Sequence, residues 1–413
     1  MRIAIYWEQE SWGGVDAHLQ ELLSTWPDPG DEFVLFYNEG NQGFARIQKE
    51  LAQISNLRCM SVLSCAHNEL SRRIRAWRSI AWLRHALHVL QPLSFVWMVS
   101  RLRRTFEKAG TFDLLLADDG AYPAAWGCLS ALFAARQAGI PARVLLVHHA
   151  AAPPALFMGW FEILIDRYVS RVASKIICVS QATRNTILEK RRINDEEVSL
   201  SVIHNGVRTQ SSSPSAQAYD VRQAVRGGKD LLIGIVGRVE PYKGQEDMIF
   251  AAARLTREVL ERIRIVMIGG GEQAHMERLR RLASQLGVGD RVHLLGYIPG
   301  ASNELIKQLD LLVVATRSFE GFGLTLVEAM REGTPILATR VGAIPEFVDE
   351  RTGYLIPPAS PGSMARAFSD FVQCQAVWMA RAKTAKEQSD AIQLQMAAEY
   401  RKTFLECIAS AGT

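Results

Sequence analysis

The residues from Thr316 to Met330 read TRSFEGFGLTLVEAM, and this stretch carries the strongest fold signal in the chain. It begins where an apolar run, Asp310–Ala315, ends, and it leads into a helical pattern over Leu324–Arg331. Gly321 and Gly323 allow the backbone to approach a ligand closely, and the free N–H groups of the helix start favour a diphosphate or a sugar hydroxyl. The stretch therefore predicts a strand, a ligand-binding turn and a helix.

Two carboxylates flank this turn eight residues apart. Glu320 lies on the predicted loop, where it is able to accept hydrogen bonds from sugar hydroxyls. Glu328 lies one turn into the predicted helix, placed to accept a bidentate hydrogen bond from vicinal ribose hydroxyls. A helical glutamate is usually only solvated, so neither residue identifies a site by itself.

Two further loops follow predicted buried strands. GRVEPYKG, Gly237 to Gly244, places Arg238 and Lys243 five residues apart, where both cations can reach one diphosphate. GGGE, Gly269 to Glu272, is rich in glycine but lacks the GxGxxG spacing, which argues against a nicotinamide dinucleotide. Each loop alone is also compatible with an ordinary solvated turn.

Outside these loops, short apolar runs alternate with helical patterns, which predicts parallel sheets covered by helices. The predicted strands are Arg2–Trp7, Phe33–Tyr37, Leu114–Ala117, Val144–His148, Lys175–Val179, Val198–Ile203, Leu231–Val236, Ile263–Ile268, Val292–Leu295, Asp310–Ala315, Pro335–Ala338 and Tyr354–Ile356. The predicted helices in the second half are Gln245–Leu260, Gln273–Leu286, Leu324–Arg331 and about Gly362–Val372.

This alternation predicts two Rossmann-like, doubly wound α/β domains, as a chain of 413 residues also suggests. The expected boundaries are a first domain over 1–208, a linker over 209–230 that contains the polar run TQSSSPSAQ, and a second domain over 231–384. A C-terminal helix over about 385–413 is expected to pack back onto the first domain. Ligands of such sheets bind at the carboxyl ends of the strands.

Taken together, in this order and each at a strand end, the three loops resemble the retaining glycosyltransferases of family four, which have the GT-B fold. Glu320 and Glu328 match that family's E-x7-E signature, and Arg238 and Lys243 match its cation pair. The chain departs from the family at Thr316-Arg317, where members often carry Pro-Ser. The resemblance implies transfer of a sugar from a UDP or GDP donor, with retention, to a hydroxyl of a saccharide or a lipid-linked glycan.

The resemblance also assigns roles to residues. Arg238, Lys243, Glu320 and His148 are the expected catalytic residues, and no metal or other cofactor is expected because two cations already neutralise the leaving group. The expected donor-binding residues are Gly13, Gly14, Gly237, Gly270, Gly321, Phe322, Gly323, Leu324 and Glu328.

In the first domain, Gly13 and Gly14 precede an amphipathic helix, and His148 and His149 lie at the end of the strand that begins at Val144. The family places a histidine beside the donor sugar, and His148 is the better match because it directly follows the last apolar residue. Asp118-Asp119 lack metal-ligand spacing and are interpreted as plain loop acids. Further predictions are that Ser180 caps the next helix and that Asn205-Gly206 form a hinge between the domains.

The composition excludes several other classes. The net charge of +4 does not suggest nucleic-acid binding, and six scattered cysteines are typical of reduced cytoplasmic thiols. The N-terminus lacks the pattern of a signal peptide. The apolar run Val89–Ser100 has twelve residues, which is short of the roughly 20 that span a bilayer.

One stretch does suggest a membrane surface. Residues 70–108 contain nine Lys or Arg and one acid, interleaved with Trp77, Trp82, Phe95 and Trp97. Cationic, aromatic-rich amphipathic segments bind anionic bilayers, so peripheral attachment to the cytoplasmic face of the membrane is one expectation. A basic, solvated helix pair is the alternative.

Two rival functions remain open from the sequence. A sugar-nucleotide 2-epimerase of the same fold uses the same donors, although it needs additional acids and bases around the sugar. A non-catalytic subunit that binds sugar nucleotides is the other, although such a protein has no need to keep both Glu320 and Lys243.

Overall fold

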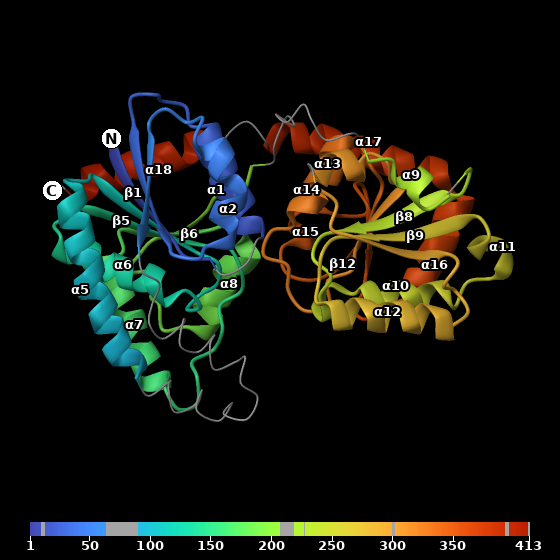
Figure 1. The fold of residues 1–413 in the computed structure, drawn as a ribbon, viewed down its shortest axis with the longest axis horizontal. Helices are drawn as coiled ribbons and strands as arrows, with labels where there is room; N and C mark the ends of the chain where they lie inside the picture. The colour runs from blue at the N-terminus through green and yellow to red at the C-terminus, as the bar shows by residue number, and fades with distance from the viewer. Residues whose placement is uncertain are drawn as a thin grey trace. The chain divides into compact units, whose positions relative to one another are not determined.

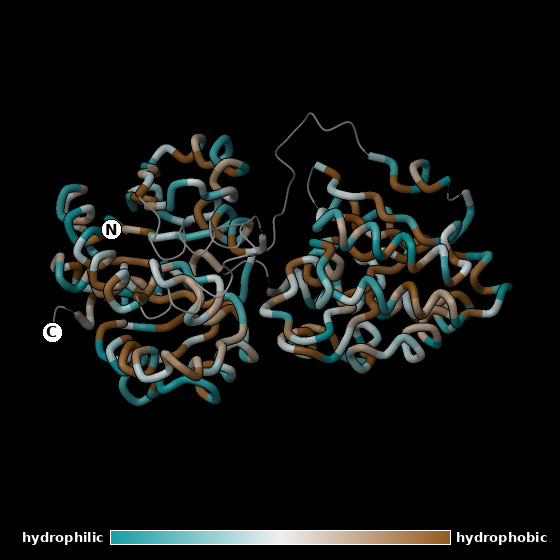
Figure 2. The backbone as a smooth tube through the Cα atoms, turned by 60° about the horizontal axis from the view of Figure 1, so that its bottom comes forward, coloured by the Kyte–Doolittle hydropathy of each residue, from teal (hydrophilic) through white to brown (hydrophobic). Residues whose placement is uncertain are grey.

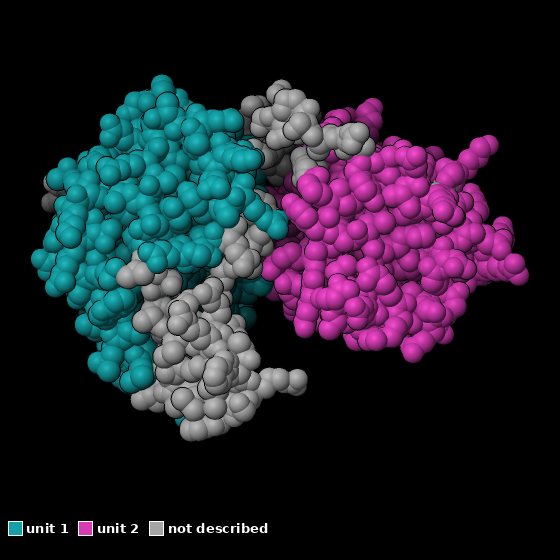
Figure 3. All heavy atoms as spheres, in the orientation of Figure 1, with its two compact units in different colours: residues 1–206, 395–413 teal, residues 207–394 magenta. Residues whose placement is uncertain are grey.

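The computed structural model describes residues 1–9, 13–62, 90–206, 219–226, 228–299, 302–392 and 396–411. Contacts divide the chain into two compact units, coloured separately in Figure 3. Unit 1 contains residues 1–206 and 395–413, and unit 2 contains residues 207–394. Each unit is a parallel sheet with helices packed on its faces (Figure 1). None of the described helices is both long enough and apolar enough to cross a membrane.

The described residues of unit 1 form a seven-stranded sheet with the order β3-β2-β1-β4-β5-β6-β7. Its strands are β1 (Arg2–Trp7), β2 (Glu32–Asn38), β3 (Leu57–Val62), β4 (Leu114–Asp119), β5 (Ala142–Val147), β6 (Lys175–Cys178) and β7 (Leu200–Val202). Its helices are α1 (Gly14–Ser24), α2 (Gln42–Leu51), α5 (Gln91–Ala109), α6 (Trp126–Gln137), α7 (Gly159–Val172), α8 (Gln181–Lys190) and α18 (Met396–Ala411). Because β1 pairs with both β2 and β4, the strand order reverses between β1 and β4.

The described residues of unit 2 form a six-stranded sheet with the order β10-β9-β8-β11-β12-β13. Its strands are β8 (Leu231–Val236), β9 (Ile263–Ile268), β10 (Val292–Gly296), β11 (Leu311–Val314), β12 (Ile336–Thr339) and β13 (Tyr354–Ile356). Its helices are α9 (Val221–Ala224), the 3-10 turn η2 (Pro241–Lys243), α10 (Gln245–Ala252), α11 (Arg257–Leu260), α12 (Gln273–Gln285), α13 (Ser302–Ile306), α14 (Leu324–Glu332), α15 (Ile344–Phe347), α16 (Pro361–Gln373) and α17 (Gln375–Ile392). Here the order reverses between β8 and β11.

The strands are central because they are apolar on both faces. Every residue of β4 and β11 is buried, as expected for strands covered by helices on both sides. Apolar strands therefore lie at the centre of each unit and polar segments on its outside (Figure 2). The doubly wound α/β architecture predicted from the sequence is confirmed in both units.

Several predicted bounds are wrong in detail. The helix expected over Gln245–Leu260 is two helices, α10 and α11, because the chain turns after Ala252 and the Thr256 hydroxyl accepts the Val259 N–H to start α11. Edge strand β3 was not predicted, because most of its residues are exposed or only half-buried and so form no continuous apolar run. The C-terminal region is not one helix from about 385, because α17 belongs to unit 2 and α18 to unit 1.

The expected linker 209–230 is also more ordered at its end than the sequence suggests. Residues 207–218, which include the polar run, lie outside the described residues. Asp220 then caps α9, the Val221 N–H donates to Gln308 Oε1 at 2.8 Å, and Arg222 pairs with Asp310 at 2.9 Å. These contacts attach residues 220–222 to unit 2.

Candidate functional site

One group of candidate residues lies at the carboxyl edge of the unit 2 sheet, where the strand order reverses between β8 and β11. The loop after β8 and the loop after β11 meet there. The Arg317 N–H donates to the Tyr242 carbonyl at 2.7 Å. Gly244 has a left-handed φ of 77°, and a Cβ at this position would overlap the carbonyl oxygen of Ala315. Reversal points of this kind are where open α/β sheets bind ligands.

Lys243 and Glu320 form an ion pair across these two loops. Lys243 Nζ lies 2.7 Å from Glu320 Oε2, and both side chains are mostly buried. The Thr316 hydroxyl donates to the same oxygen at 2.8 Å, and the Ala343 N–H donates to the Glu320 carbonyl at 2.9 Å. Lys243 carries three N–H donors, so the Glu320 bond leaves two for a ligand.

Arg238 and Lys243 both contact Tyr242. Its Nη2 donates to the Tyr242 hydroxyl at 3.3 Å, while Lys243 Nζ lies 5.3 Å from the centre of the Tyr242 ring. Arg238 Nη1 pairs with Glu240 Oε1 at 3.0 Å, and the side chain is 46% exposed. Burial, and then the hydrogen bond with Glu240, raise the pKa of Tyr242, so its hydroxyl stays neutral. The structure thus brings together both predicted cations around one aromatic ring.

The start of α14 adjoins the Lys243–Glu320 pair. Gly323 has a left-handed φ of 87° and precedes the helix, and a Cβ at this position would lie 3.5 Å from Cγ of Glu320. The backbone N–H groups of Leu324 and Thr325 lie at the free start of this nine-residue helix. The ring of Phe322 is buried against Phe347 at a centroid distance of 4.9 Å, so it supports the loop from beneath.

Glu328 lies one turn further along α14, as predicted. The Ser302 hydroxyl donates to its Oε1 at 2.6 Å, and its Oε2 is buried with no hydrogen-bond partner among the described residues. Burial raises the pKa of Glu328 to about 7, which the Ser302 hydrogen bond partly opposes. An unpaired, buried carboxylate oxygen of this kind is suited to accept hydroxyl groups of a ligand.

Arg317 is one of the two residues at which the sequence departs from the pattern it otherwise resembles. Its guanidinium forms a bidentate pair with Asp247, with distances of 2.8 and 2.7 Å, and a longer contact of 3.3 Å with Glu246. Asp247 and Glu246 are in the first turn of α10, directly after Lys243. The departure from Pro-Ser therefore links the β11 loop to the element that positions Lys243.

The glycine-rich loop after β9 joins the same edge. The Val239 N–H donates to the Gly270 carbonyl at 2.8 Å, and the Gly237 N–H donates to the Ile268 carbonyl at 2.9 Å. These two hydrogen bonds place the loop after β8 beside the glycine-rich loop after β9. The predicted donor-site glycines of the second domain, Phe322 and Leu324 thus belong to loops or a helix start on one edge of the unit 2 sheet, and Glu328 lies one turn into α14.

Unit 1 has its own candidate residues at the carboxyl edge of its sheet. Gly14 is the first residue of α1, and the Gly13 N–H donates to the Asp16 carboxylate at 2.5 Å. His148 directly follows β5 and is 8% exposed. His149, the alternative, is only half-buried.

The interpretation of Asp118 and Asp119 as loop acids is wrong. They are the last two residues of β4 and are fully buried. Asp118 Oδ1 lies 2.8 Å from His148 Nε2, and Asp119 Oδ1 accepts the N–H groups of Ala121 and Ala125. Burial raises the pKa of Asp119 well above its usual value. Asp118 therefore fixes the orientation of the His148 ring.

Other site residues also escaped prediction. Tyr242 was quoted only as part of a loop, and Ser302 lies 26 positions from Glu328, too far for a local motif to connect them. His18 of α1 is fully buried with its ring 4.8 Å from that of His148, edge to face. Burial, and then the neighbouring His148, lower the pKa of His18 well below its usual value. Ser180 does cap α8 through the Thr183 N–H, as predicted.

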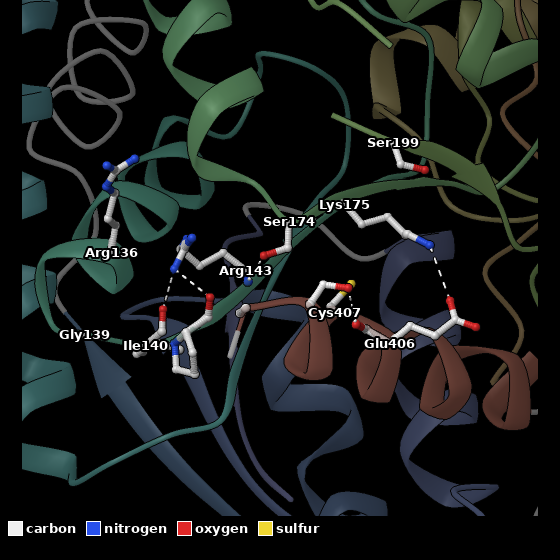
Figure 4. Close-up of a pocket in the computed structure, with 12 residues that line it drawn as sticks. Arg136, Gly139, Ile140, Arg143, Ser174, Lys175, Ser199, Glu406 and Cys407 are labelled. Atoms are coloured by element: carbon white, nitrogen blue, oxygen red, sulfur yellow. Dashed lines mark hydrogen bonds and ion pairs between the residues drawn. The ribbon is translucent and has the colours of Figure 1, made fainter. Parts of the chain in front are cut away.

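A cavity elsewhere in unit 1 contains none of the predicted site residues. Its volume is about 710 Å³, and it lies at the amino ends of β5 and β6, against the last turns of α18. Figure 4 shows its lining, with Arg143 bonded to the carbonyls of Ile140 and Pro141 and with Lys175 paired to Glu406 at 3.7 Å. The predicted residues of unit 1 lie at the opposite ends of these strands.

Comparison with known proteins agrees with this architecture. Residues 218–390 match the family model "Glycosyl transferases group 1", and residues 12–211 match "Glycosyltransferase Family 4". The chain is 34% identical over 179 residues to the D-inositol 3-phosphate glycosyltransferase of Corynebacterium glutamicum, covering 41% of this chain and 42% of the relative. It is 29% identical over 222 residues to that of Streptomyces scabiei, covering 51% and 48%. The chain thus spans about half the length of the curated relatives it matches.

Solved structures with low sequence identity share the fold over almost the whole chain. HepE of Anabaena, in complex with UDP and glucose, has a TM-score of 0.72 at 18% identity, covering 99% of this chain and 100% of HepE. WaaG, a glycosyltransferase involved in lipopolysaccharide biosynthesis, has a TM-score of 0.62 at 14% identity, covering 97% and 99%. The two parallel-sheet units therefore have the GT-B fold. With both family models matched, the chain belongs to the family-four, group 1 glycosyltransferases.

Proposed function

We propose that this protein transfers a sugar from a nucleotide-diphosphate donor to a hydroxyl acceptor. The observation that carries the proposal is the Lys243–Glu320 pair, 2.7 Å apart across the β8/β11 reversal and next to the free start of α14. In this pair, Lys243 supplies a cation that can bind a diphosphate, and Glu320 supplies a carboxylate that can accept hydrogen bonds from sugar hydroxyls. The rest of the proposal assigns the parts of the donor to the residues around that pair.

The nucleotide end of the donor is assigned to Glu328. Its free Oε2 accepts the ribose hydroxyls, and its carboxylate is already oriented by Ser302. The diphosphate is assigned to the N–H groups at the start of α14 and to Arg238 and Lys243. The sugar is assigned to Glu320. UDP is one candidate nucleotide, because HepE, which shares the fold, contains UDP and glucose.

In the reaction, the bond between the anomeric carbon and the diphosphate oxygen breaks, and its electron pair stays on the diphosphate. Arg238 and Lys243 stabilise this growing negative charge, which is the largest electrostatic demand of the step. The acceptor hydroxyl forms the new bond to the anomeric carbon and gives its proton to the departing phosphate oxygen. Attack from the same face retains the anomeric configuration, as in the family. Because the two cations neutralise the leaving group, we propose that no metal is required.

From unit 1 we assign His148, oriented by Asp118, to a sugar hydroxyl, and the glycines at the start of α1 to the diphosphate. The acceptor is a hydroxyl of a saccharide or of a lipid-linked glycan. The names of the inositol-phosphate relatives make a phosphorylated polyol an additional acceptor to test.

The proposal is tested by following release of nucleoside diphosphate from UDP- and GDP-sugars, with and without acceptors. We expect slow hydrolysis that accelerates with the correct acceptor and persists in EDTA. Lys243→Ala is expected to lower kcat about 100-fold or more, as loss of one leaving-group donor does elsewhere. Lys383→Ala, an exposed lysine on α17, serves as the control.

The outcome also separates the rivals. A 2-epimerase produces an epimeric donor without releasing diphosphate, and a non-catalytic subunit binds the donor with no turnover. Wild-type kcat in Lys243→Ala would contradict the assignment of that residue.

A further inference from the structure

Large apolar side chains are exposed together at the starts of two neighbouring helices of unit 1. They are Leu93 (69% exposed), Val96 (62%) and Trp97 (44%) of α5, with Leu156 (99%), Phe157 (91%), Trp160 (62%) and Leu164 (56%) in α7 and the turn before it. The helix starts adjoin, because Phe95 of α5 and Phe161 of α7 meet edge to face with ring centroids 5.9 Å apart. Figure 1 shows α5 and α7 side by side. We call these seven side chains the apolar tip.

Exposed cations follow the apolar tip on both helices with the same spacing. The exposed residues on one face of α5 are Trp97, Arg101, Arg104 and Lys108, and those on one face of α7 are Trp160, Leu164, Arg167 and Arg171. At 1.5 Å per residue, Arg101 lies about 6 Å beyond Trp97, and Arg167 lies about 5 Å beyond Leu164. The Arg101 guanidinium also lies over the Trp97 ring at 5.4 Å.

The acids of these two helices are paired with arginines. The two carboxylates of α7, Glu162 and Asp166, point inward, where Arg191 pairs with them at 2.8 and 2.9 Å. The acid on α5, Glu107, is paired with Arg103 at 2.7 Å. The exposed side of the two helices is therefore apolar at the tip and positively charged one to three turns further on.

The apolar tip lies on the same edge of unit 1 as the candidate site residues. Helices that cross between parallel strands start at the carboxyl ends of those strands. Leu156 and Phe157 are in the connection from β5 to α7, and this same connection begins with His148. A surface bound at the tip therefore lies beside the edge of unit 1 that carries His148.

We propose that α5 and α7 dock unit 1 on an anionic lipid bilayer, with the apolar tip inserted below the headgroups and Arg101 and Arg167 on the lipid phosphates. The offset of 5 to 6 Å between apolar and cationic side chains suits the boundary between acyl chains and headgroups, and tryptophan is favoured at that depth. The docking itself does not depend on the proposed function. Only its purpose does, which is to bring a lipid-linked acceptor to the enzyme. It moves the membrane contact from the basic stretch 70–108 as a whole to these two helix starts. Residues 70–89 of that stretch lie outside the described residues.

The test is co-sedimentation of the full chain with vesicles of phosphatidylcholine, with and without phosphatidylglycerol. We expect the wild type to bind the anionic vesicles at low salt and to be released at high salt, where the Debye length falls to about 3 Å near 1 M. Arg101→Gln/Arg167→Gln is expected to weaken binding roughly 30-fold, since each cation contributes about 1 kcal/mol near an anionic surface. Phe157→Ser/Trp160→Ser is expected to weaken it at least as much and to leave the residual binding sensitive to salt.

Matched controls come from unit 2. Val377→Ser/Met379→Ser removes two side chains that are 51% and 53% exposed, and Arg281→Gln/Lys383→Gln removes two exposed cations. Both are expected to bind vesicles as the wild type does. Donor binding and hydrolysis without acceptor are measured on all variants and are expected to stay unchanged, so a failure of the proposed function is seen separately.

Wild type that does not bind anionic vesicles at low salt overturns the inference. The inference is also overturned if the variants of unit 1 bind anionic vesicles as tightly as the control variants of unit 2. If light scattering shows that the wild type is a dimer and the tip variants are monomers, with no vesicle binding, the surface is a subunit interface and the proposal is wrong.

Discussion

Glu328 is the residue whose ionisation the structure sets most clearly. Burial places its pKa near 7, while the assigned role requires a carboxylate that accepts ribose hydroxyls. Donor binding must then release a proton wherever Glu328 is protonated in the free protein. We expect the donor Kd to rise about tenfold for each pH unit below 7. Isothermal titration calorimetry in buffers of different ionisation enthalpy measures both the Kd and the released proton.

The control for this prediction is Glu328→Gln, which cannot titrate. Its donor Kd is expected to be higher than that of the wild type at pH 8 and nearly independent of pH from 5.5 to 8. A wild-type profile that is equally flat would show that this carboxyl group does not ionise on binding.

The raised pKa of Glu328 also implies that its ionised carboxylate lowers the stability of the folded protein at high pH. The folded-state pKa of Glu328, about 7, is raised above its ordinary value of 4.5, so the folded state holds the proton more tightly between these values. Its contribution to stability is therefore highest below pH 4.5 and falls as pH rises toward 7. Because part of the side chain is accessible, we expect Glu328→Gln to stabilise the protein by only about 1 kcal/mol at pH 8.

Thermal melts of the two proteins at pH 8 and pH 5 measure this effect. The advantage of Glu328→Gln should shrink at the lower pH. A variant that is less stable than the wild type at pH 8 would mean that the buried carboxylate is favourably solvated in the folded state.

At the scale of elements, Arg317 connects the β11 loop to the start of α10 and so aligns Glu320 with Lys243. Arg317→Ala leaves Asp247, whose side chain is 4% exposed, without its bidentate partner, which costs about 1–3 kcal/mol. We expect both a lower melting temperature and a loss of roughly tenfold in kcat/KM. Arg317→Lys is expected to restore the charge but not the bidentate geometry, and so only part of the activity.

Arg278→Ala is the matched control for this prediction. Arg278 pairs with Glu246 at 2.7 Å from α12 and does not join the two loops. It should lower stability slightly and leave kcat/KM unchanged. Equal losses of kcat/KM in Arg317→Ala and Arg278→Ala would reduce the role of Arg317 to general stability.

Sequence patterns predicted those elements whose signals are local. The loops at Gly237–Gly244 and Thr316–Gly323 follow continuous apolar strands, so their shared location at one sheet edge followed from the α/β topology. The Asp118–His148 contact was not predictable in this way, since it depends on β4 and β5 being neighbours. Edge strand β3 has no continuous apolar run because it is mostly exposed. The α7 part of the apolar tip was missed because Trp160 and Leu164 look like core residues in a helical pattern, whereas Trp97 was already part of the basic stretch that suggested a membrane surface.

At the scale of the whole molecule, the chain returns to unit 1 for its last helix. Tyr400 and Phe404 of α18 are buried, the Phe404 ring lies 5.7 Å from that of Trp26, and Arg401 pairs with Asp31 at 2.8 Å. Phe404→Ala is therefore expected to destabilise unit 1 by about 3–5 kcal/mol. Unit 2 has its own hydrophobic core, so nucleotide binding should persist.

Calorimetry with and without UDP or GDP measures this separation. We expect a low-temperature transition that Phe404→Ala lowers and a second transition that the nucleotide raises in both proteins. A single transition that is lowered by Phe404→Ala and raised by the nucleotide would show that the two units do not unfold independently.

The central claim is that the β8, β11 and α14 edge of unit 2 binds a nucleotide-diphosphate sugar. Its most direct test is the thermal stabilisation of wild type and Glu328→Gln by a panel of UDP- and GDP-sugars. We predict that at least one donor stabilises the wild type by about 2.7 kcal/mol at 100 times its Kd, and that Glu328→Gln loses most of this shift at the same concentration. If no donor stabilises the wild type, or if Glu328→Gln responds equally, the claim is contradicted.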